Sequence, residues 1–156
     1  MKLKVYLETT IPSLLTARPS RDVLIAGQQQ ATRDWWQERR HRYHLLVSGL
    51  VLLESRRGDA SAARERDEVL AVCDVLEYTE AAQSLARDIL ATRLLPAKAA
   101  VDAAHIAVAA VHEVDFLLTW NCRHIANAAI VDKVRATIAA AGYTPPVICT
   151  PLELML

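Results

Sequence analysis

The chain has 156 residues, 53% of them hydrophobic and 23% charged, which is the composition of a single globular domain. Its 18 basic and 18 acidic side chains cancel, which argues against a broadly basic nucleic-acid-binding surface and leaves only local patches for such contacts. The three cysteines, Cys73, Cys122 and Cys149, contain no C-x-x-C pair, so neither a disulfide framework nor a cysteine zinc site is expected.

Nothing in the sequence predicts a membrane segment. The longest uncharged apolar run, Leu45 to Leu53, is shorter than the roughly 18 to 20 residues that cross a bilayer. The first residues, Met1 to Glu8, lack the apolar core of a signal peptide. We therefore expect a cytoplasmic protein that does not bind membranes.

The first half of the chain predicts three strands separated by helices. Apolar and mixed residues alternate from Leu3 to Leu7, which predicts a strand, and Pro12 is expected to prevent that strand from continuing. Ser48 is the expected N-cap of a short helix that contains Glu54. In chain order, we expect a strand at 3–7, a helix at 22–40, a strand at 43–47, helices at 49–57 and 60–71, and a strand at 72–78.

The second half continues the alternation. Pro96 suits the first position of a helix, and Gly142 suits a helix end. The expected elements are helices at 79–95 and 97–112, a strand at 115–119, a helix at 125–141 and a strand at 147–149. This pattern predicts one α/β domain over residues 1–156, with a mostly parallel sheet and helices on both faces.

Four oxygen-bearing side chains are expected at the carboxyl edge of this sheet, where open parallel sheets form their sites. Glu8 directly follows the first strand, Glu54 lies in the helix that leaves the second, and Asn121 comes two residues after Thr119. Asp102 lies near the start of a helix that runs back into the next strand, so it is expected at the same edge.

Asp102 is expected to share its helix face with His105, Ile106 and Ala109. A carboxylate on an apolar face is costly to bury unless a positive charge compensates it. Three carboxylates and an amide are oxygen ligands of the kind that Mg²⁺ or Mn²⁺ prefers, and such ions activate water against phosphodiesters. The residues therefore predict metal-dependent phosphoester chemistry, without selecting RNA.

At these positions the sequence resembles the PIN-domain ribonucleases, and within them the VapC-like toxins of bacterial toxin–antitoxin pairs. Four segments between Val5 and Pro151 carry the resemblance in the right order and spacing: Val5–Thr10, Ser48–Glu54, Asp102–Ala107 and Leu117–Ile125. It implies a three-layer α/β/α fold, cleavage of RNA, an acidic Mg²⁺ site, frequent homodimers and often a small antitoxin partner. The family's four site positions fall on Glu8, Glu54, Asp102 and Asn121.

The sequence departs from the family pattern twice. Glu8 stands where the family usually has Asp, and it is one methylene longer, whereas Mg²⁺ tolerates little error in its octahedron. Asn121 stands where the family often has a fourth acid, and it supplies only a neutral oxygen. Asn121 is also suited to cap a following helix.

Several neighbours of the four residues have two interpretations. Thr9 and Thr10 either support Glu8 by hydrogen bonding or end the strand, and Thr119 is expected to hold the loop of Asn121. The residues that are either phosphate contacts or solvated side chains are Arg18, Arg21, Arg123 and His124. His105 is expected to be a buried core histidine, and one residue of the Trp35–Trp36 pair is expected at a dimer or partner interface.

Our preferred hypothesis from the sequence is a metal-dependent endoribonuclease that uses Glu8, Glu54, Asp102 and Asn121. The alternative is a PIN-like module that binds nucleic acid or protein with little or no catalysis, which the two departures favour. A different Mg²⁺ phosphohydrolase fits less well, because the sequence has neither an Asp-x-Asp pair nor a glycine-rich phosphate loop.

Overall fold

The computed structural model describes residues 1–155 and contains a five-stranded sheet in the order β3-β2-β1-β4-β5. Every neighbouring pair of strands is parallel. The strands are β1 (Lys4–Leu7), β2 (His44–Ser48), β3 (Asp74–Leu76), β4 (Phe116–Leu118) and β5 (Val147–Cys149). The predicted α/β fold is confirmed, and its sheet is wholly rather than mostly parallel.

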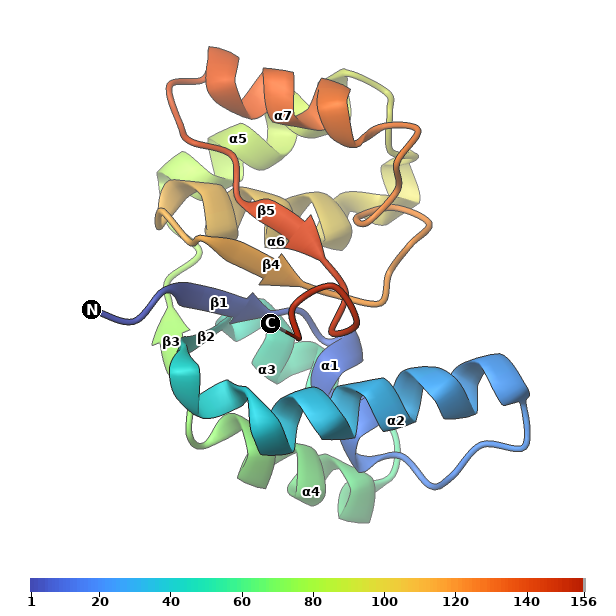
Figure 1. Cartoon of the computed structure of the whole chain (residues 1–156). Coiled ribbons are helices and arrows are strands. Elements are labelled where there is room, and N and C mark those ends of the chain that lie inside the picture. The colour runs from blue at the N-terminus through green and yellow to red at the C-terminus, as the bar shows by residue number, and fades with distance from the viewer. Residues whose placement is uncertain (156) are drawn as a thin grey trace.

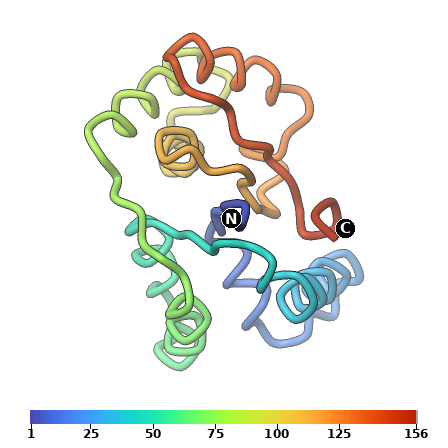
Figure 2. Tube along the Cα trace, turned by 60° about the vertical axis from the view of Figure 1, so that its left-hand side comes forward, coloured from blue at the N-terminus to red at the C-terminus, as the bar shows by residue number. Residues whose placement is uncertain are grey.

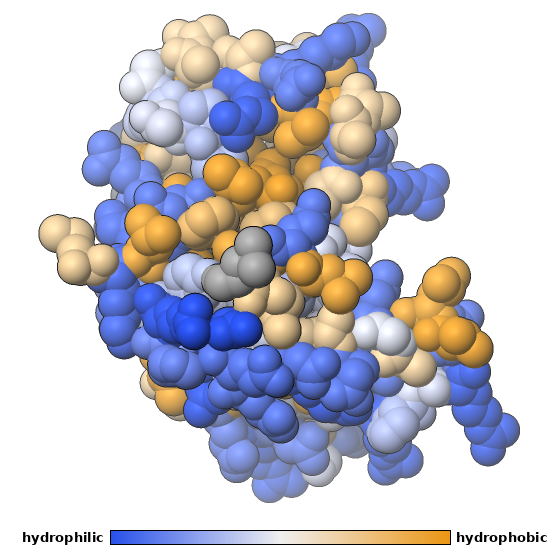
Figure 3. All heavy atoms as spheres, viewed as in Figure 1, coloured by the Kyte–Doolittle hydropathy of each residue, from blue (hydrophilic) through white to orange (hydrophobic). Residues whose placement is uncertain are grey.

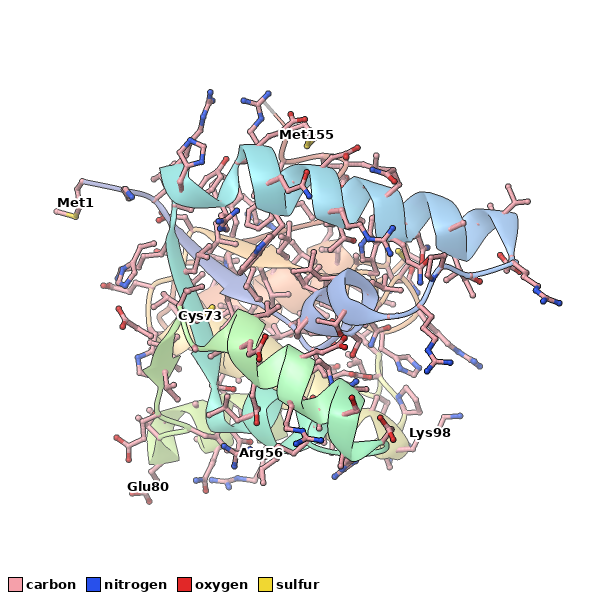
Figure 4. All side chains as sticks on the ribbon, turned by 90° about the horizontal axis from the view of Figure 1, so that it is seen from below. Met1, Arg56, Cys73, Glu80, Lys98 and Met155 are labelled. Atoms are coloured by element: carbon pink, nitrogen blue, oxygen red, sulfur yellow. The ribbon has the colours of Figure 1, made fainter. Side chains whose placement is uncertain are left out.

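Helices cover both faces of the sheet, as the two views in Figures 1 and 2 show. The lower layer contains α1 (Thr10–Thr16), α2 (Val23–Glu38), α3 (Gly49–Ser55) and α4 (Ala60–Leu70). The upper layer contains α5 (Glu80–Ala91), α6 (Ala100–Val111) and α7 (Val131–Ala140). Seen from below, α1 lies between α2 and α4 (Figure 4). Short 3₁₀ turns at Arg40–Arg42 and Ala97–Ala99 precede β2 and α6.

The core lies between the sheet and these two layers. Residues 103–110 of α6 are all buried, because this helix is apolar on every side and packs between β4 and α5. Val5, Tyr6 and Leu7 of the central strand β1 are completely buried, as expected for a strand covered on both faces. The sheet is therefore a rigid base for side chains at its ends.

The connections reverse direction at β1. From β1 the chain moves outward to β2 and β3 through the lower helices, and it then returns to the other side of β1 to form β4 and β5. Right-handed crossovers place the helices of the two halves on opposite faces, so the loops after β1 and β4 diverge. Such a point is where open α/β sheets bind ligands.

The structure corrects the predicted elements at two places. Pro12 was expected to end the first strand and no helix was predicted there, but Pro12 lies in the first turn of α1, where its missing N–H costs no hydrogen bond. The helix predicted from Ile125 begins six residues later, at Val131, because residues 121–126 instead form turns around the Asn121 carbonyl. Both errors fall beside the predicted site.

Other predicted boundaries shift by a few residues. Ser48 is the N-cap residue of α3, but its hydroxyl makes no capping hydrogen bond. The helix expected from Ala97 begins as the 3₁₀ turn and becomes α-helical at Ala100. Of residues 1–155, none belongs to a helix that is both long and apolar enough to cross a membrane.

Candidate active site

A cavity of about 460 Å³ opens at the carboxyl edge of the sheet, beside the ends of β1 and β4. All four predicted site residues line it: Glu8, Glu54, Asp102 and Asn121. The remaining lining residues are Thr9, Thr10, Ser13, Leu14, Ile25, Gln28 and Trp120. The lining thus combines three carboxylates with uncharged side chains and includes no lysine, arginine or histidine.

Glu8 is the most buried of the three acids, with 4% of its surface exposed. Its Oε2 accepts hydrogen bonds from the Thr10 amide at 3.1 Å, the Thr10 hydroxyl at 2.5 Å and the Thr119 hydroxyl at 2.8 Å. Within residues 1–155, no basic side chain forms an ion pair with it. Burying a carboxylate costs free energy that hydrogen bonds offset only in part, so this position favours a nearby cation.

Thr10 and Thr119 each form two hydrogen bonds that connect Glu8 to the loop after β4. The Thr10 hydroxyl accepts from the Trp120 amide at 2.9 Å, and the Thr119 hydroxyl accepts from the Asn121 amide at 2.9 Å. A hydroxyl has a single proton, and a carboxylate can only accept, so both hydroxyls donate to Glu8. The loop that carries Asn121 is therefore fixed to the first acid.

Glu54 is held through its Oε1, which accepts from the Thr9 hydroxyl at 2.7 Å and from His105 Nε2 at 2.6 Å. Partial burial acts to raise the pKa of Glu54, but the hydrogen bonds from His105 and Thr9 outweigh it and hold the pKa below its ordinary value. Thr9 therefore supports Glu54, whereas from the sequence it was expected either to support Glu8 or to end the strand.

Asp102 lies in the first turn of α6, as predicted, and its Oδ2 is 2.9 Å from Nδ1 of His124. The backbone amide of His124 in turn donates to Oδ1 of Asn121 at 3.0 Å. Asn121 thus closes a turn instead of capping a helix, because α7 begins only at Val131. His124 connects the third acid to the amide residue.

Each carboxylate has one oxygen without a protein partner among the described residues. The bonded oxygens are Oε2 of Glu8, Oε1 of Glu54 and Oδ2 of Asp102, which leaves Oε1, Oε2 and Oδ1, respectively. These oxygens are of the type that Mg²⁺ or Mn²⁺ prefers, so the donor chemistry fits such an ion. The spacing does not fit as it stands, because no three His, Cys, Asp or Glu side chains within 1–155 are grouped closely enough to hold a metal.

The four predicted substrate contacts are not among the residues that line this cavity. Arg18 lines a different cavity, of about 260 Å³, between α1 and α4. Arg21 and Arg123 are exposed. His124 is half-buried and bonded to Asp102. A phosphate contact by any of them stays a prediction.

Several other residues at the site were not predicted from the sequence. Ser13 and Leu14 were overlooked because α1 was not predicted. Trp120 forms part of the wall, and its indole nitrogen donates to the Thr32 hydroxyl at 2.8 Å. Its position between Thr119 and Asn121 in the sequence was the signal that could have identified Trp120 as a site residue. His105, expected as a core residue, is buried as predicted but bonds directly to Glu54.

The remaining sequence predictions concern assembly. Trp35 is completely buried, whereas Trp36 is half-buried, with the Arg40 guanidinium 5.1 Å from its ring centroid. Part of Trp36 is therefore already covered within the chain. A dimer interface at Trp36 stays a prediction.

No protein-family model and no curated protein matches the sequence. Solved structures do match the fold. A VapBC complex from Salmonella typhimurium bound to DNA has a TM-score of 0.62 at 15% identity, covering 96% of this chain and 98% of that one. VapBC2 from Rickettsia felis, bound to a DNA fragment from its promoter, has a TM-score of 0.61 at 10% identity, covering 94% and 97%.

A third match is VapC20 from Mycobacterium tuberculosis, a toxin that cleaves the sarcin–ricin loop. Its TM-score is 0.60 at 17% identity, covering 90% of this chain and 96% of that one. All three alignments extend over nearly the whole of both chains, and the parallel sheet with helices on both faces agrees with them. The chain therefore has the PIN-domain fold of VapC proteins.

Proposed function

We propose that this protein is a VapC-like endoribonuclease that hydrolyses phosphodiester bonds of RNA. The observation that carries the proposal is the cavity at the carboxyl edge, lined by three carboxylates and by no basic side chain. RNA is a polyanion, so an acidic cavity suits it only if a cation neutralises the carboxylates. The fold supports the same activity, since one neighbour is a toxin that cleaves the sarcin–ricin loop.

The roles that we assign follow from how each side chain is held. Glu8 is fixed by three hydrogen bonds, and its charge makes the cavity negative. Glu54 and Asp102 are each oriented by a histidine. Each has a second carboxylate oxygen without a protein partner among residues 1–155. Leu14, Ile25 and Trp120 supply the apolar part of the cavity wall.

We propose Mg²⁺ or Mn²⁺ as the cofactor, held by Glu8, Glu54 and Asp102 with help from Asn121. When bound, such an ion polarises a phosphoryl oxygen and activates water. Because the carboxylates are not grouped for an ion in this structure, binding requires their free oxygens to approach one another. We expect the half-buried Glu54 and Asp102 to move more easily than Glu8.

The test is cleavage of a structured RNA by the purified protein with Mg²⁺, with Mn²⁺ and with EDTA. We expect cleavage with either ion and none with the chelator, and activity should return when excess Mn²⁺ is added back. RNA cleavage by the variant Glu54→Gln is compared with cleavage by a matched control. The control is Glu68→Gln, at an exposed position of α4. Cleavage that persists in EDTA would contradict the metal-dependent mechanism.

The alternative is a binding module with weak or no catalysis, which the departures at Glu8 and Asn121 and the ungrouped carboxylates favour. Calorimetric titration separates the two functions. Binding of Mn²⁺ at millimolar concentration or tighter, reduced by Asp102→Asn, supports the nuclease. Binding of RNA with no detectable Mn²⁺ binding supports the module.

We also propose an antitoxin partner and a homodimer, both in the cytoplasm. Two of the matching structures are VapBC complexes, which supports a protein partner. Val23, Leu24 and Ile25 form an exposed apolar end of α2, visible as a projecting hydrophobic group in Figure 3, and Ile25 also lines the cavity. Light scattering of the purified chain, alone and with the product of a neighbouring reading frame, tests both assemblies.

A further inference from the structure

A buried hydrogen-bonded chain leads from β2 to the active-site acid Glu54. The Ser48 hydroxyl lies 2.7 Å from the Tyr6 hydroxyl, and the Tyr6 hydroxyl lies 2.7 Å from Nδ1 of His105. His105 Nε2 lies 2.6 Å from Oε1 of Glu54. Ser48, Tyr6 and His105 are all completely buried, so water does not compete for these bonds.

The direction of the chain follows from counting protons. An ionised Glu54 can only accept, so Nε2 of His105 carries a proton. Burial raises the pKa of Tyr6 well above its usual range, so its hydroxyl keeps the one proton it has. That proton goes either to Nδ1 of His105 or to the Ser48 oxygen.

The first direction uses every proton. Ser48 then donates to Tyr6, Tyr6 donates to Nδ1, and Nε2 donates to Glu54. In the reverse direction the Ser48 proton has no acceptor, since its hydroxyl has no second partner among residues 1–155. A buried hydrogen-bond donor without an acceptor destabilises the fold. The first direction is therefore favoured.

We infer that His105 is a positioning residue for Glu54, and that Tyr6 and Ser48 fix its proton on Nε2. The hydrogen bond holds Oε1 of Glu54 against α6 and leaves Oε2, at the cavity, without a partner among residues 1–155. This hydrogen bonding can be tested without RNA, whereas its effect on rate rests on the proposed function. Loss of a partner that orients a site carboxylate typically lowers activity about 10- to 100-fold.

Tyr6→Phe is the first test, because it removes the hydroxyl and keeps the ring in the core. We expect kcat for RNA cleavage to fall about 10- to 100-fold while KM changes less than about twofold. Tyr43→Phe is the matched control, since Tyr43 stacks on Trp35 and its hydroxyl makes no hydrogen bond within residues 1–155. Equal kinetics for the two variants would overturn the inference.

A pair of substitutions at His105 separates positioning from packing. Gln carries a side-chain N–H that can replace Nε2–H, whereas Leu fills similar space without a donor. We expect His105→Gln to retain at least about ten times the kcat of His105→Leu at comparable thermal stability. Equal loss in both variants, with both folded, would assign His105 a merely structural role.

Nitrogen-15 NMR of the histidine rings tests the hydrogen bonding independently of activity. We expect the proton of His105 on Nε2 at neutral pH, with the Nδ1 signal shifted in Tyr6→Phe and unchanged in Tyr43→Phe. A proton on Nδ1 would overturn the inference even if RNA is cleaved. The expected spectra from a protein that leaves RNA intact would support the orientation of Glu54 and contradict the proposed function.

Discussion

Two cavities at opposite edges of the sheet are lined by side chains of opposite charge. The cavity at the carboxyl edge is lined by Glu8, Glu54 and Asp102 and has no basic lining residue. A second cavity, of about 410 Å³, lies at the amino edge, with Lys2, Arg40, His41 and His44 in its lining and no acidic residue. The two cavities therefore differ in charge although the net charge of the chain is zero.

Helix direction supports this separation. In a parallel α/β fold the helices begin near the carboxyl edge and end near the amino edge, and their dipoles favour anions at the first and cations at the second. Asp102 lies in the first turn of α6, and the basic turn Arg40–Arg42 follows the end of α2. We therefore expect charge at the carboxyl edge to affect the proposed cleavage more than charge at the amino edge.

The largest effect is expected when a carboxylate at the carboxyl edge is neutralised. We expect Asp102→Asn to lower the rate of RNA cleavage by about 100- to 1000-fold, because it removes a charge from the site while keeping its shape. Asp115→Asn is the matched control, since Asp115 binds the Lys4 amide before β4 begins. Comparable losses in both variants would show that the two edges do not differ as proposed.

Stability should also differ between the site and the rest of the surface. Thr119→Val removes a buried donor to Glu8, and we expect the free energy of unfolding to fall by about 1.5 to 3 kcal/mol. Urea denaturation measures this change. Thr137→Val, whose hydroxyl binds the Lys133 carbonyl within α7, should cost less than about 0.5 kcal/mol.

The contribution of Glu54 to the stability of the fold depends on pH. Its pKa is lowered in the folded protein, so its stabilising effect is complete above the ordinary value of 4.5 and is lost as the pH falls through the lowered pKa. We expect the stability advantage of the wild type over Glu54→Gln to be constant well above pH 4.5 and to shrink as the pH falls below it. Denaturation curves at several pH values measure it, and an advantage that grows on acidification would contradict the assignment.

The smallest effect is expected at the amino edge. Strands of this length separate the edges by roughly 15 Å, which exceeds the Debye length of about 8 Å at physiological salt. Lys2→Glu should therefore change the cleavage rate less than about twofold at 0.15 M salt. At about 0.01 M salt the charge reaches further, and cleavage should become measurably slower. A large effect at high salt would indicate direct RNA contact at Lys2.

The elements that depend on the local sequence pattern were predicted correctly. The alternation around Val5 and the apolar stretch before Thr119 predicted β1 and β4, and the antiparallel run of α6 and β4 correctly placed Asp102. Pro12 was expected only to end the first strand, and α1 was missed because proline is also compatible with the first turn of a helix. The late start of α7 depends on the Asn121 carbonyl, which accepts two turn bonds that no periodicity reveals.

The residues that hold the site acids in place were harder to predict than the acids themselves. Glu8, Glu54 and Asp102 are recognisable because each follows from strand and helix order. Tyr6 was expected only as part of a strand, Ser48 as a helix cap and His105 as a core residue. Their mutual bonds connect segments that are 42 and 99 residues apart. Such pairings depend on the packed interior, so sequence alone left His105 as a satisfied core histidine.

The double hydrogen bonds of Thr10 and Thr119 make two backbone amides reporters of the first acid. The Trp120 and Asn121 amides donate to the same hydroxyls that donate to Glu8, so any shift of that carboxylate alters all four bonds together. Hydrogen exchange at these two positions should therefore slow or quicken in unison when the cavity is filled. Because the loop of Trp120 and Asn121 is linked in this way to the Glu8 carboxylate, exchange of the two amides reports on the site without any substrate.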